Sequence, residues 1–236
     1  MVLLKEILIE ESLEKDAEAC LVKPSPNFDL AEKLPQNQFV IKETPNAGQG
    51  MFAQSDILPG TIILREKPLL VMPDKIFSDD DSNIIEDWLD RKLLKLSAEN
   101  RKAFYDLADS RMEGNEKSIL GIFFTNDMSF IDDSAALFPT MARVNHSCRP
   151  NADFVSRPLL GVQDLVATRF IPQGQEIFIS YLPASAEGSQ IQKARRAYTR
   201  EWYGFACTCT ECCLKVRQVF VGVKAHSQWS ADTLFC

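Results

Sequence analysis

The sequence predicts a β-rich α+β domain that carries one helical insert. Short apolar and β-branched runs, separated by turns that contain proline or glycine, indicate many short strands on both sides of residues 78–113. Within 78–113 the apolar side chains instead follow a helical period. The chain has 236 residues, 45% of them hydrophobic, which is enough to bury one sizeable core or two small ones.

The elements follow in order from these patterns. Residues 1–22 have the pattern of an acidic amphipathic helix, and prolines between 24 and 35 indicate a linker. The insert contains two predicted helices, and Ser97 is the expected N-cap of the second. A further helix is expected over 190–203. The expected strands are 39–42, 51–53, 61–63, 69–71, 119–125, 152–156, 165–167 and 176–181.

The charge of the chain disfavours nucleic acid as a partner. Lys and Arg number 26 against 33 Asp and Glu, a net charge of −7, so the excess positive charge that binds phosphate backbones is missing. A basic ligand is the better electrostatic match, although a charge of −7 is also what solubility alone requires. No apolar run approaches the roughly 18 to 20 residues that span a bilayer. We therefore expect no membrane association, and a reducing compartment, either the cytoplasm or the nucleus.

The cysteines are the strongest chemical signal, with seven in the chain against two histidines. Cys207, Cys209 and Cys212 have the close spacing that lets one short loop wrap a zinc ion. Cys213 is next to Cys212 and is poorly placed to reach the same ion, so Cys148, in a polar segment upstream, is the predicted fourth ligand. The alternative is a set of unrelated thiols.

Two shorter motifs are ambiguous. Residues 48–53, GQGMFA, fit the dinucleotide pattern G-x-G-x-x-A, but a turn follows them where that pattern needs a helix. The two glycines then indicate either a backbone that approaches a ligand closely or a tight hairpin. His146 and Cys148 suggest a Cys-His nucleophile pair, but we expect residues so near in the chain to point apart.

Four segments in order carry a family resemblance: GQGMFA at 48–53, NHSCRPN at 145–151, GQEIFISY at 174–181, and Arg195-Arg196 followed by YGFACTCTEC at 203–212. From about residue 38 to 214 the sequence resembles the SET-domain protein lysine methyltransferases, and most of all the SMYD-type proteins and their fungal relatives without a MYND zinc finger. The resemblance implies a SET fold of several small sheets with a threaded C-terminal segment.

The implied organisation has four parts. Residues 1–37 form an N-terminal helix and linker, and 38–182 form the SET domain with a helical insert at about 74–118. Residues 190–214 form a post-SET zinc-binding region, and 215–236 form a C-terminal tail. The long helical C-terminal domain of the SMYD proteins has no counterpart in this sequence, which implies a more open substrate groove.

The resemblance also implies two bound groups, S-adenosylmethionine and one structural zinc ion. The implied cofactor contacts are the backbone of Ala47, Gly48 and Gln49, with Gly50 adjoining, and Asn145, His146, Tyr181 and Phe205. The implied zinc ligands are the set favoured by spacing, Cys148, Cys207, Cys209 and Cys212. Four thiolates leave no open position on zinc, which excludes a catalytic role for the ion under this assignment.

The implied reaction is methyl transfer to the side-chain amine of a lysine in a protein, histone or non-histone. Tyr181 and Tyr203 are the implied catalytic residues of an aromatic lysine channel. A phenol with a pKa near 10 is protonated at neutral pH, so Tyr181 is expected to orient the amine and stabilise the transition state. The alternative for Tyr203 is a core aromatic beside the zinc loop.

Two other function classes remain open. The familiar Asn-x-Phe of the family reads Asn126-Asp127-Met128 here, so a catalytically weak or inactive SET-fold module that binds a peptide or protein is the second hypothesis. A zinc-dependent nucleic-acid binder is the third, and the net charge of −7 opposes it. The expected partner is a basic protein or peptide that contains lysine, bound by a monomer.

Overall fold

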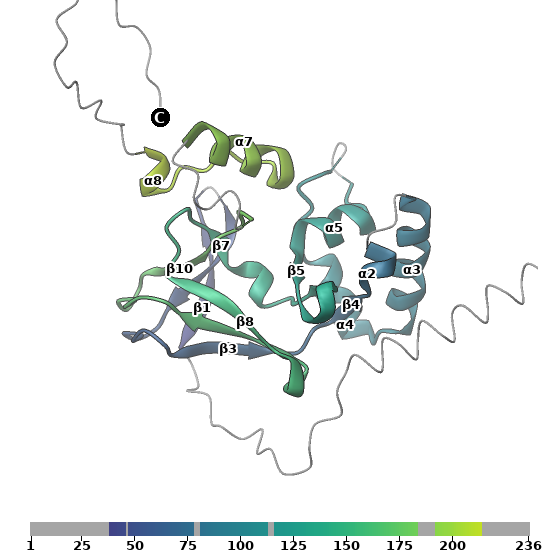
Figure 1. Ribbon diagram of the computed structural model, residues 1–236, viewed down its shortest axis with the longest axis horizontal. Coiled ribbons are helices and arrows are strands. Elements are labelled where there is room, and N and C mark those ends of the chain that lie inside the picture. Colours follow the sequence, from purple (N-terminus) through teal and green to yellow (C-terminus); the bar gives the residue numbers. More distant parts are fainter. Residues whose placement is uncertain (1–37, 46, 78–80, 113–115, 184–191, 214–236) are drawn as a thin grey trace, which may run out of the picture.

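The computed structural model describes residues 38–45, 47–77, 81–112, 116–183 and 192–213 (Figure 1). The helix expected over 1–22, the linker after it and the tail 215–236 lie outside the described residues. The strands are β1 Phe39–Thr44, β2 Gly48–Ala53, β3 Ile62–Glu66, β4 Leu70–Met72, β5 Asp127–Ser129, β6 Ala135–Leu137, β7 Asn145–His146, β8 Ala152–Arg157, β9 Val162–Ala167 and β10 Glu176–Ile179. The helices are α2 Asp74–Phe77, α3 Ser82–Lys95, α4 Ala98–Tyr105, α5 Ile119–Asn126, α7 Gln192–Tyr203 and α8 Thr210–Cys213, with short 3₁₀ turns at η1 Ile131–Asp133, η2 Met141–Arg143 and η3 Pro158–Leu160.

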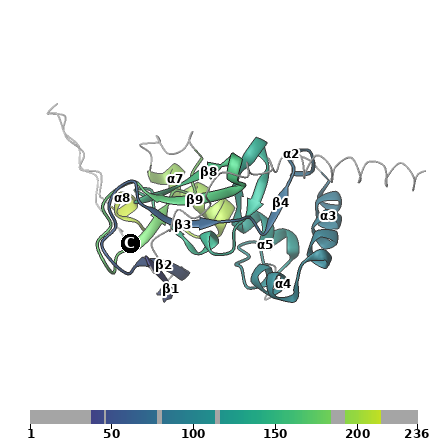
Figure 2. The ribbon, with the colours of Figure 1, turned by 90° about the horizontal axis from the view of Figure 1, so that it is seen from below.

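The strands form three small sheets, which confirms the predicted β-rich α+β fold. Their orders are β1-β2-β10-β7, β3-β9-β8 and β4-β6-β5. Figure 2 shows α3, α4 and α5 gathered at one end of the molecule, away from the β1–β2 hairpin. Helices α7 and α8 lie beside the β10–β7 side of the four-stranded sheet (Figure 1).

The pairing of β7 with β10 is parallel and joins two of the sequence motifs. Asn145 lies opposite Phe178, and His146 lies opposite Ile179. Asn151 extends the connection, because its side chain donates to the carbonyl of Glu176 at 2.9 Å and accepts from the N–H of Phe178 at 2.7 Å. Residues 145–151 and 174–181 are thus held side by side, although about thirty residues separate them in sequence.

Two hydrophobic cores support this arrangement, one of the two possibilities that the chain length allowed. The first lies under the sheets and includes Met51, Phe138, Leu165 and Ile177, and the second joins the helices to β4 and β6. Leu89, Phe104 and Phe123 are fully buried in the second core. The helical segment therefore packs against β4 and β6 through the second core, which is separate from the first.

The helices of the insert begin at capped residues. Asp81 accepts from the N–H of Asn83 at 2.9 Å, and Ser97 accepts from the N–H of Asn100 at 3.2 Å, which confirms Ser97 as the predicted N-cap. These side chains satisfy backbone donors that the first turn leaves unpaired. Among the described residues, no helix combines the length and the apolar character needed to cross a membrane.

The strand predicted over 119–125 is wrong, because this segment is helix α5. Its aromatic and β-branched side chains favoured a strand, and an apolar run this short does not distinguish a strand from a buried helix. Ser118 caps the N-terminus of this helix, because its hydroxyl accepts from the N–H of Gly121 at 2.9 Å. Ile122 and Phe123 then pack into the second core.

Candidate functional site

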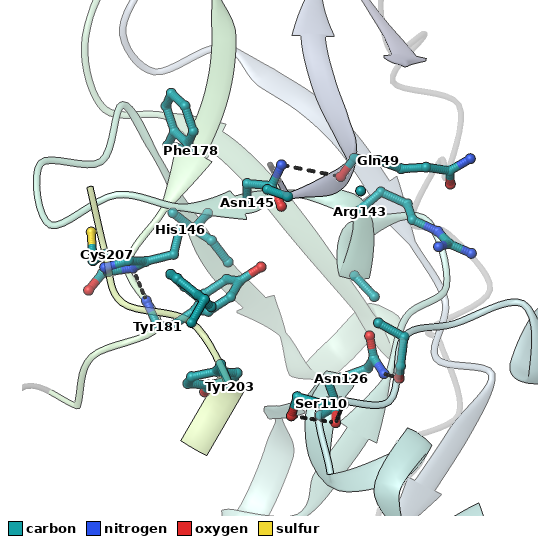
Figure 3. A pocket seen from close by; sticks show the side chains of 18 of the residues that line it. Gln49, Ser110, Asn126, Arg143, Asn145, His146, Phe178, Tyr181, Tyr203 and Cys207 are labelled. Atoms are coloured by element: carbon teal, nitrogen blue, oxygen red, sulfur yellow. Dashed lines mark hydrogen bonds between the residues drawn. The ribbon is translucent and has the colours of Figure 1, made fainter. Parts of the chain in front are cut away.

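One cavity of about 1420 Å³ lies between the four-stranded sheet, the end of α5 and the segment from α7 to the cysteines. We call it the cleft. All eight residues that the sequence assigned to the cofactor or to catalysis line it: Ala47, Gly48, Gln49, Asn145, His146, Tyr181, Tyr203 and Phe205. In Figure 3, Tyr181 lies between His146 and Tyr203. The fold thus brings residues from four segments of the chain to one surface.

The glycine motif forms one end of the cleft as a tight hairpin, one of its two proposed interpretations. Strand β1 pairs with β2 from Thr44 opposite Gly48 onward. Gly48 has a φ of +62°, a conformation that favours glycine. Thr44 fixes the turn, since its hydroxyl donates to the carbonyl of Gly48 at 2.9 Å and accepts from the N–H of Ala47 at 3.1 Å. The exposed backbone of Ala47 to Gln49 therefore borders the cleft in a defined conformation.

Asn145 ties this hairpin to β10. Its side-chain amide donates to the carbonyl of Gln49 at 3.2 Å, a bond drawn in Figure 3, and to the carboxylate of Glu176 at 2.8 Å. A Cβ at Gly50 would overlap the Glu176 carboxylate and lie 2.7 Å from Cγ2 of Thr44 and 2.9 Å from Nδ2 of Asn145. The network therefore requires glycine at position 50.

Tyr181 follows β10 and is held at both its backbone and its hydroxyl. Its N–H donates to Nδ1 of His146 at 3.0 Å, and its hydroxyl donates to the carbonyl of Val144 at 2.7 Å. Burial, with smaller contributions from Tyr203 and Glu176, raises the pKa of the Tyr181 phenol above its usual value. Tyr181 is therefore a protonated phenol whose hydrogen is engaged and whose oxygen still has capacity to accept a hydrogen bond.

His146 uses both ring nitrogens within the protein. Burial, assisted by the charge of Arg195, lowers the pKa of His146 to about 4, so the ring is neutral at pH 7. Nδ1 accepts from Tyr181, so the proton is on Nε2, which lies 3.3 Å from Sγ of Cys148. The expectation that His146 and Cys148 point apart is wrong, because residues two apart in an extended chain share a face. The contact does not form an isolated nucleophile pair, since the Cys148 sulfur also adjoins other thiols.

Tyr203 and Phe205 complete an aromatic cluster around Tyr181. The ring centroids of Tyr181 and Tyr203 are 4.7 Å apart, and those of Tyr181 and Phe205 are 6.4 Å apart. Burial, then the charges of Tyr198 and Asp127, raise the pKa of Tyr203 to about 12. Tyr203 lines the cleft and belongs to neither hydrophobic core, so its alternative interpretation as a core aromatic is not supported.

The end of α7 directs these two rings into the cleft. Gly204 has a φ of +73° and its N–H donates to the carbonyl of Arg200 at 3.2 Å, which ends the helix. The hydroxyl of Thr199 accepts from the N–H of Cys207 at 3.2 Å. The helix end, the aromatic pair and the first cysteine of the loop are thereby one connected unit.

The structure brings together the four thiols that the sequence selected. The sulfurs of Cys148, Cys207, Cys209 and Cys212 all lie within 4.8 Å of one another. Sγ of Cys148 is 3.5 Å from Sγ of Cys212 and 3.8 Å from Sγ of Cys207. Zinc bonds to sulfur of about 2.3 Å in a tetrahedron require separations of about 3.8 Å, so the donor set fits zinc. Cys213 is outside this group, and its thiol donates to the carbonyl of Thr208 at 3.2 Å.

The surroundings of the thiols favour a cation at their centre. Burial raises the pKa of the Cys148 thiol above its usual value and that of Cys207 to about 12, whereas at Cys209 burial is outweighed by hydrogen bonds that lower the pKa to about 7. Several thiolates buried together need a compensating charge. The guanidinium of Arg195 interacts with the sulfurs of Cys148 and Cys212. Arg195 would offset part of the negative charge of a four-thiolate site.

Sequence reasoning gave no role to Asp127 or Tyr198, and both line the cleft. Asp127 follows the apolar run of α5 directly, and a charged residue at such a boundary was an available signal. Tyr198 lies on the same helix as Tyr203, with ring centroids 6.5 Å apart. Met128, which stands where the family pattern has an aromatic residue, also lines the cleft and packs against the first core.

The fold and the cleft define the class of protein. The family model described as "SET domain" matches residues 48–182, and the chain belongs to the SET-domain family. This match contains strand β2 with Gly48 and Gly50, the 145–151 motif and Tyr181.

Three relatives show which branches of the family are similar. The chain is 30% identical over 175 residues to histone-lysine N-methyltransferase set5 of Schizosaccharomyces pombe, covering 74% of this chain and 50% of that protein. It is 25% identical over 169 residues to N-lysine methyltransferase SMYD2 of Gallus gallus, covering 67% and 37%. It is 33% identical over 81 residues to histone-lysine N-methyltransferase ASHR2 of Arabidopsis thaliana, covering 32% and 19%. The chain thus spans half or less of the length of these relatives.

Proposed function

We propose that this chain is a protein-lysine N-methyltransferase that uses S-adenosylmethionine. The observation that carries the proposal is the cluster of Tyr181, Tyr203 and Phe205 beside the glycine hairpin in one cleft of a SET-domain chain. The relatives named as histone-lysine or N-lysine methyltransferases support the same reaction. The substrate is a protein, histone or non-histone, and the site of action is the nucleus or the cytoplasm.

The cleft residues fit the proposed cofactor. The bound cofactor supplies a methyl group on a positively charged sulfonium. The exposed residues Ala47 to Gln49 border the cleft at the hairpin, and the ring of Phe205 offers an apolar face. His146 is neutral, so its ring does not oppose the positive charge, and with both ring nitrogens engaged it is left to contact the cofactor by its backbone or ring edge.

The aromatic cluster suits a lysine side chain that must lose its proton. A lysine ammonium has a pKa of about 10.4 and no lone pair, and an enclosed aromatic channel disfavours the charged form. The Tyr181 oxygen is available to accept from the amine, because its own proton goes to the carbonyl of Val144. Tyr181 would then orient the amine for in-line attack, while the ring of Tyr203 confines the side chain.

The thiol cluster would hold zinc as a structural ion and connect it to this chemistry. Cys207, Cys209 and Cys212 follow Tyr203 and Phe205 directly, so the ion would fix the loop that carries both rings. His146 adds a second link, since its ring joins the sulfur of Cys148 to the backbone of Tyr181. Loss of the ion is therefore expected to disorder the aromatic side of the cleft.

Binding and transfer can be measured separately. Calorimetry of the zinc-loaded chain with S-adenosylmethionine tests the cofactor site. Incubation with methyl-labelled cofactor, first with core histones and then with a proteome extract, followed by mass spectrometry of labelled lysines, tests the reaction. Cofactor binding without label on any lysine would instead favour a binding module, the candidate that Met128 supports, and the absence of cofactor binding by folded chain contradicts the proposal.

Gly50→Ala is expected to weaken cofactor binding without unfolding the chain. The new Cβ displaces the Glu176 carboxylate and the Asn145 amide, which hold the hairpin against β10. Overpacking of this kind destabilises a folded chain by roughly 1–3 kcal/mol. We expect the displaced hairpin also to lose about 1.4 kcal/mol of cofactor binding, which raises the Kd for S-adenosylmethionine about 10-fold. Gly60→Ala is a matched control, because nothing lies within 4 Å of the added Cβ, although its φ of +82° imposes a backbone cost. Equal Kd values for Gly50→Ala and the parent chain would show that this network does not shape the cofactor site.

A further inference from the structure

Asp127 places a carboxylate in the cleft at the start of an edge strand. It follows α5 directly, and its N–H donates to the carbonyl of Phe123 at the end of that helix, which fixes its backbone. Strand β5, which Asp127 begins, is the outer strand of the sheet β4-β6-β5. The side chain lines the same cavity as the aromatic cluster.

This carboxylate lines the cleft together with Tyr198 and Tyr203 and has no ion-pair partner among the described residues. Its charge acts on Tyr203 and on Tyr198, raising the pKa of both. Against the effect of burial, Arg111 lowers the pKa of Asp127, and its guanidinium lies over the rings of Phe124, at 5.1 Å, and Trp202, at 5.8 Å. Arg111 is thus engaged with rings and only partly offsets the charge of Asp127.

Two other carboxylates, one buried and one half-buried like Asp127, have their charge satisfied. Asp164 accepts from Arg65 at 2.7 Å and from Arg157 at 2.8 Å. Glu66 accepts from the N–H groups of Thr140 and Met141, both at 2.9 Å. Burial of an unpaired carboxylate is unfavourable, and a cation that enters the cleft would relieve it. Asp127 differs from Asp164 and Glu66 in lacking such partners, which favours a role in binding a cationic ligand.

We propose, resting on the proposed function, that the Asp127 carboxylate docks the ammonium of the substrate lysine as it enters the cleft. The proposal makes Asp127 a residue that selects lysine over a neutral side chain of similar length. An ammonium at this position gains a charge-assisted hydrogen bond and contact with the faces of Tyr198 and Tyr203.

The docking interaction should weaken as the pH falls. Burial, partly offset by Arg111, raises the pKa of Asp127 to about 7, so the carboxylate is ionised above that pH and neutral below it. The tyrosines that line the cleft with it do not titrate there: Tyr198 and Tyr203, with raised pKa values, stay neutral. Preference for a lysine side chain should therefore increase between about pH 6 and about pH 8.

The experiment compares binding of two synthetic peptide libraries with lysine or norleucine at the central position. S-adenosylhomocysteine is present, so no methyl group is transferred. For the parent chain, the ratio of lysine-peptide to norleucine-peptide binding should rise with pH. Asp127→Asn should lower that ratio about 10-fold at pH 8 and remove its pH dependence, as expected for loss of a hydrogen bond to a charged group.

Asp90→Asn is the matched control, because Asp90 is exposed on α3 outside the cleft and the substitution removes the same charge. It should leave the ratio unchanged. Asp127→Glu, which keeps the charge, should retain a preference for lysine. A ratio that does not depend on pH in the parent chain, or that Asp127→Asn leaves unchanged, overturns the proposal.

The outcomes also separate this inference from the proposed function. Binding is measured without turnover. If the chain discriminates lysine through Asp127 but labels no protein, the docking proposal is supported and the proposed enzyme activity is contradicted. If the chain methylates lysine and Asp127→Asn leaves the ratio of lysine-peptide to norleucine-peptide binding unchanged, the proposed activity is supported and the docking proposal is contradicted.

Discussion

Cys148→Ser is expected to remove zinc from the chain and to loosen the segment from α7 to the cysteine loop. Cys148 is the predicted ligand outside residues 207–212, and its sulfur joins the 145–151 motif to that loop. A serine hydroxyl does not replace a thiolate on zinc, and structural zinc binding supplies folding free energy directly. We expect zinc affinity to fall at least about 100-fold, measured by competition with a chelator.

Hydrogen exchange gives the structural readout for the same variant. Amides of residues 199–207, which include the Cys207 N–H bound to Thr199, should lose protection. Exchange at the N–H of Tyr181 should also rise, because His146 links it to Cys148. Cys213→Ser is the control, since Cys213 is exposed and outside the cluster. Full zinc content in Cys148→Ser would exclude the four-thiol site.

Much of the fold was readable from local sequence because local chemistry determines it. Ser97 caps α4 as predicted, and the bond from the N–H of Ala47 to the Thr44 hydroxyl closes the turn between β1 and β2. The segment 119–125 was misread because its helix depends on the Ser118 cap and on burial in the second core. Propensity alone favours a strand for such residues, and tertiary packing overrides it.

The site residues were predicted only in part, because some of them come together through contacts between segments that are distant in sequence. The spacing of Cys207, Cys209 and Cys212 indicated a metal loop, and the need for a fourth thiol led to Cys148. The contact between His146 and Cys148 was missed because the extended backbone at 145–146 comes from pairing with β10. Asp127 was missed as a site residue because its aromatic neighbours, Tyr198 and Tyr203, lie about 70 residues further along the chain.

Tyr181→Phe is expected to lower kcat for methyl transfer about 100-fold while leaving the Kd for S-adenosylmethionine within about 2-fold. The phenylalanine ring keeps the contact with Tyr203, so the wall of the cleft should remain. The lost group is the hydroxyl that donates to Val144 and whose oxygen is proposed to accept from the amine. The measurement is initial rate against concentration of an identified substrate protein, with cofactor binding followed by calorimetry.

Tyr105→Phe is the matched control, because it removes a hydroxyl from an exposed tyrosine on α4 outside the cleft. It should match the parent in both kcat and Kd. A Tyr181→Phe chain that raises KM alone would show that the hydroxyl contributes to substrate binding and not to the transition state. Because the Val144 carbonyl also loses its donor in Tyr181→Phe, a comparison of hydrogen exchange at 144–146 distinguishes a lost catalytic hydroxyl from a displaced strand β7.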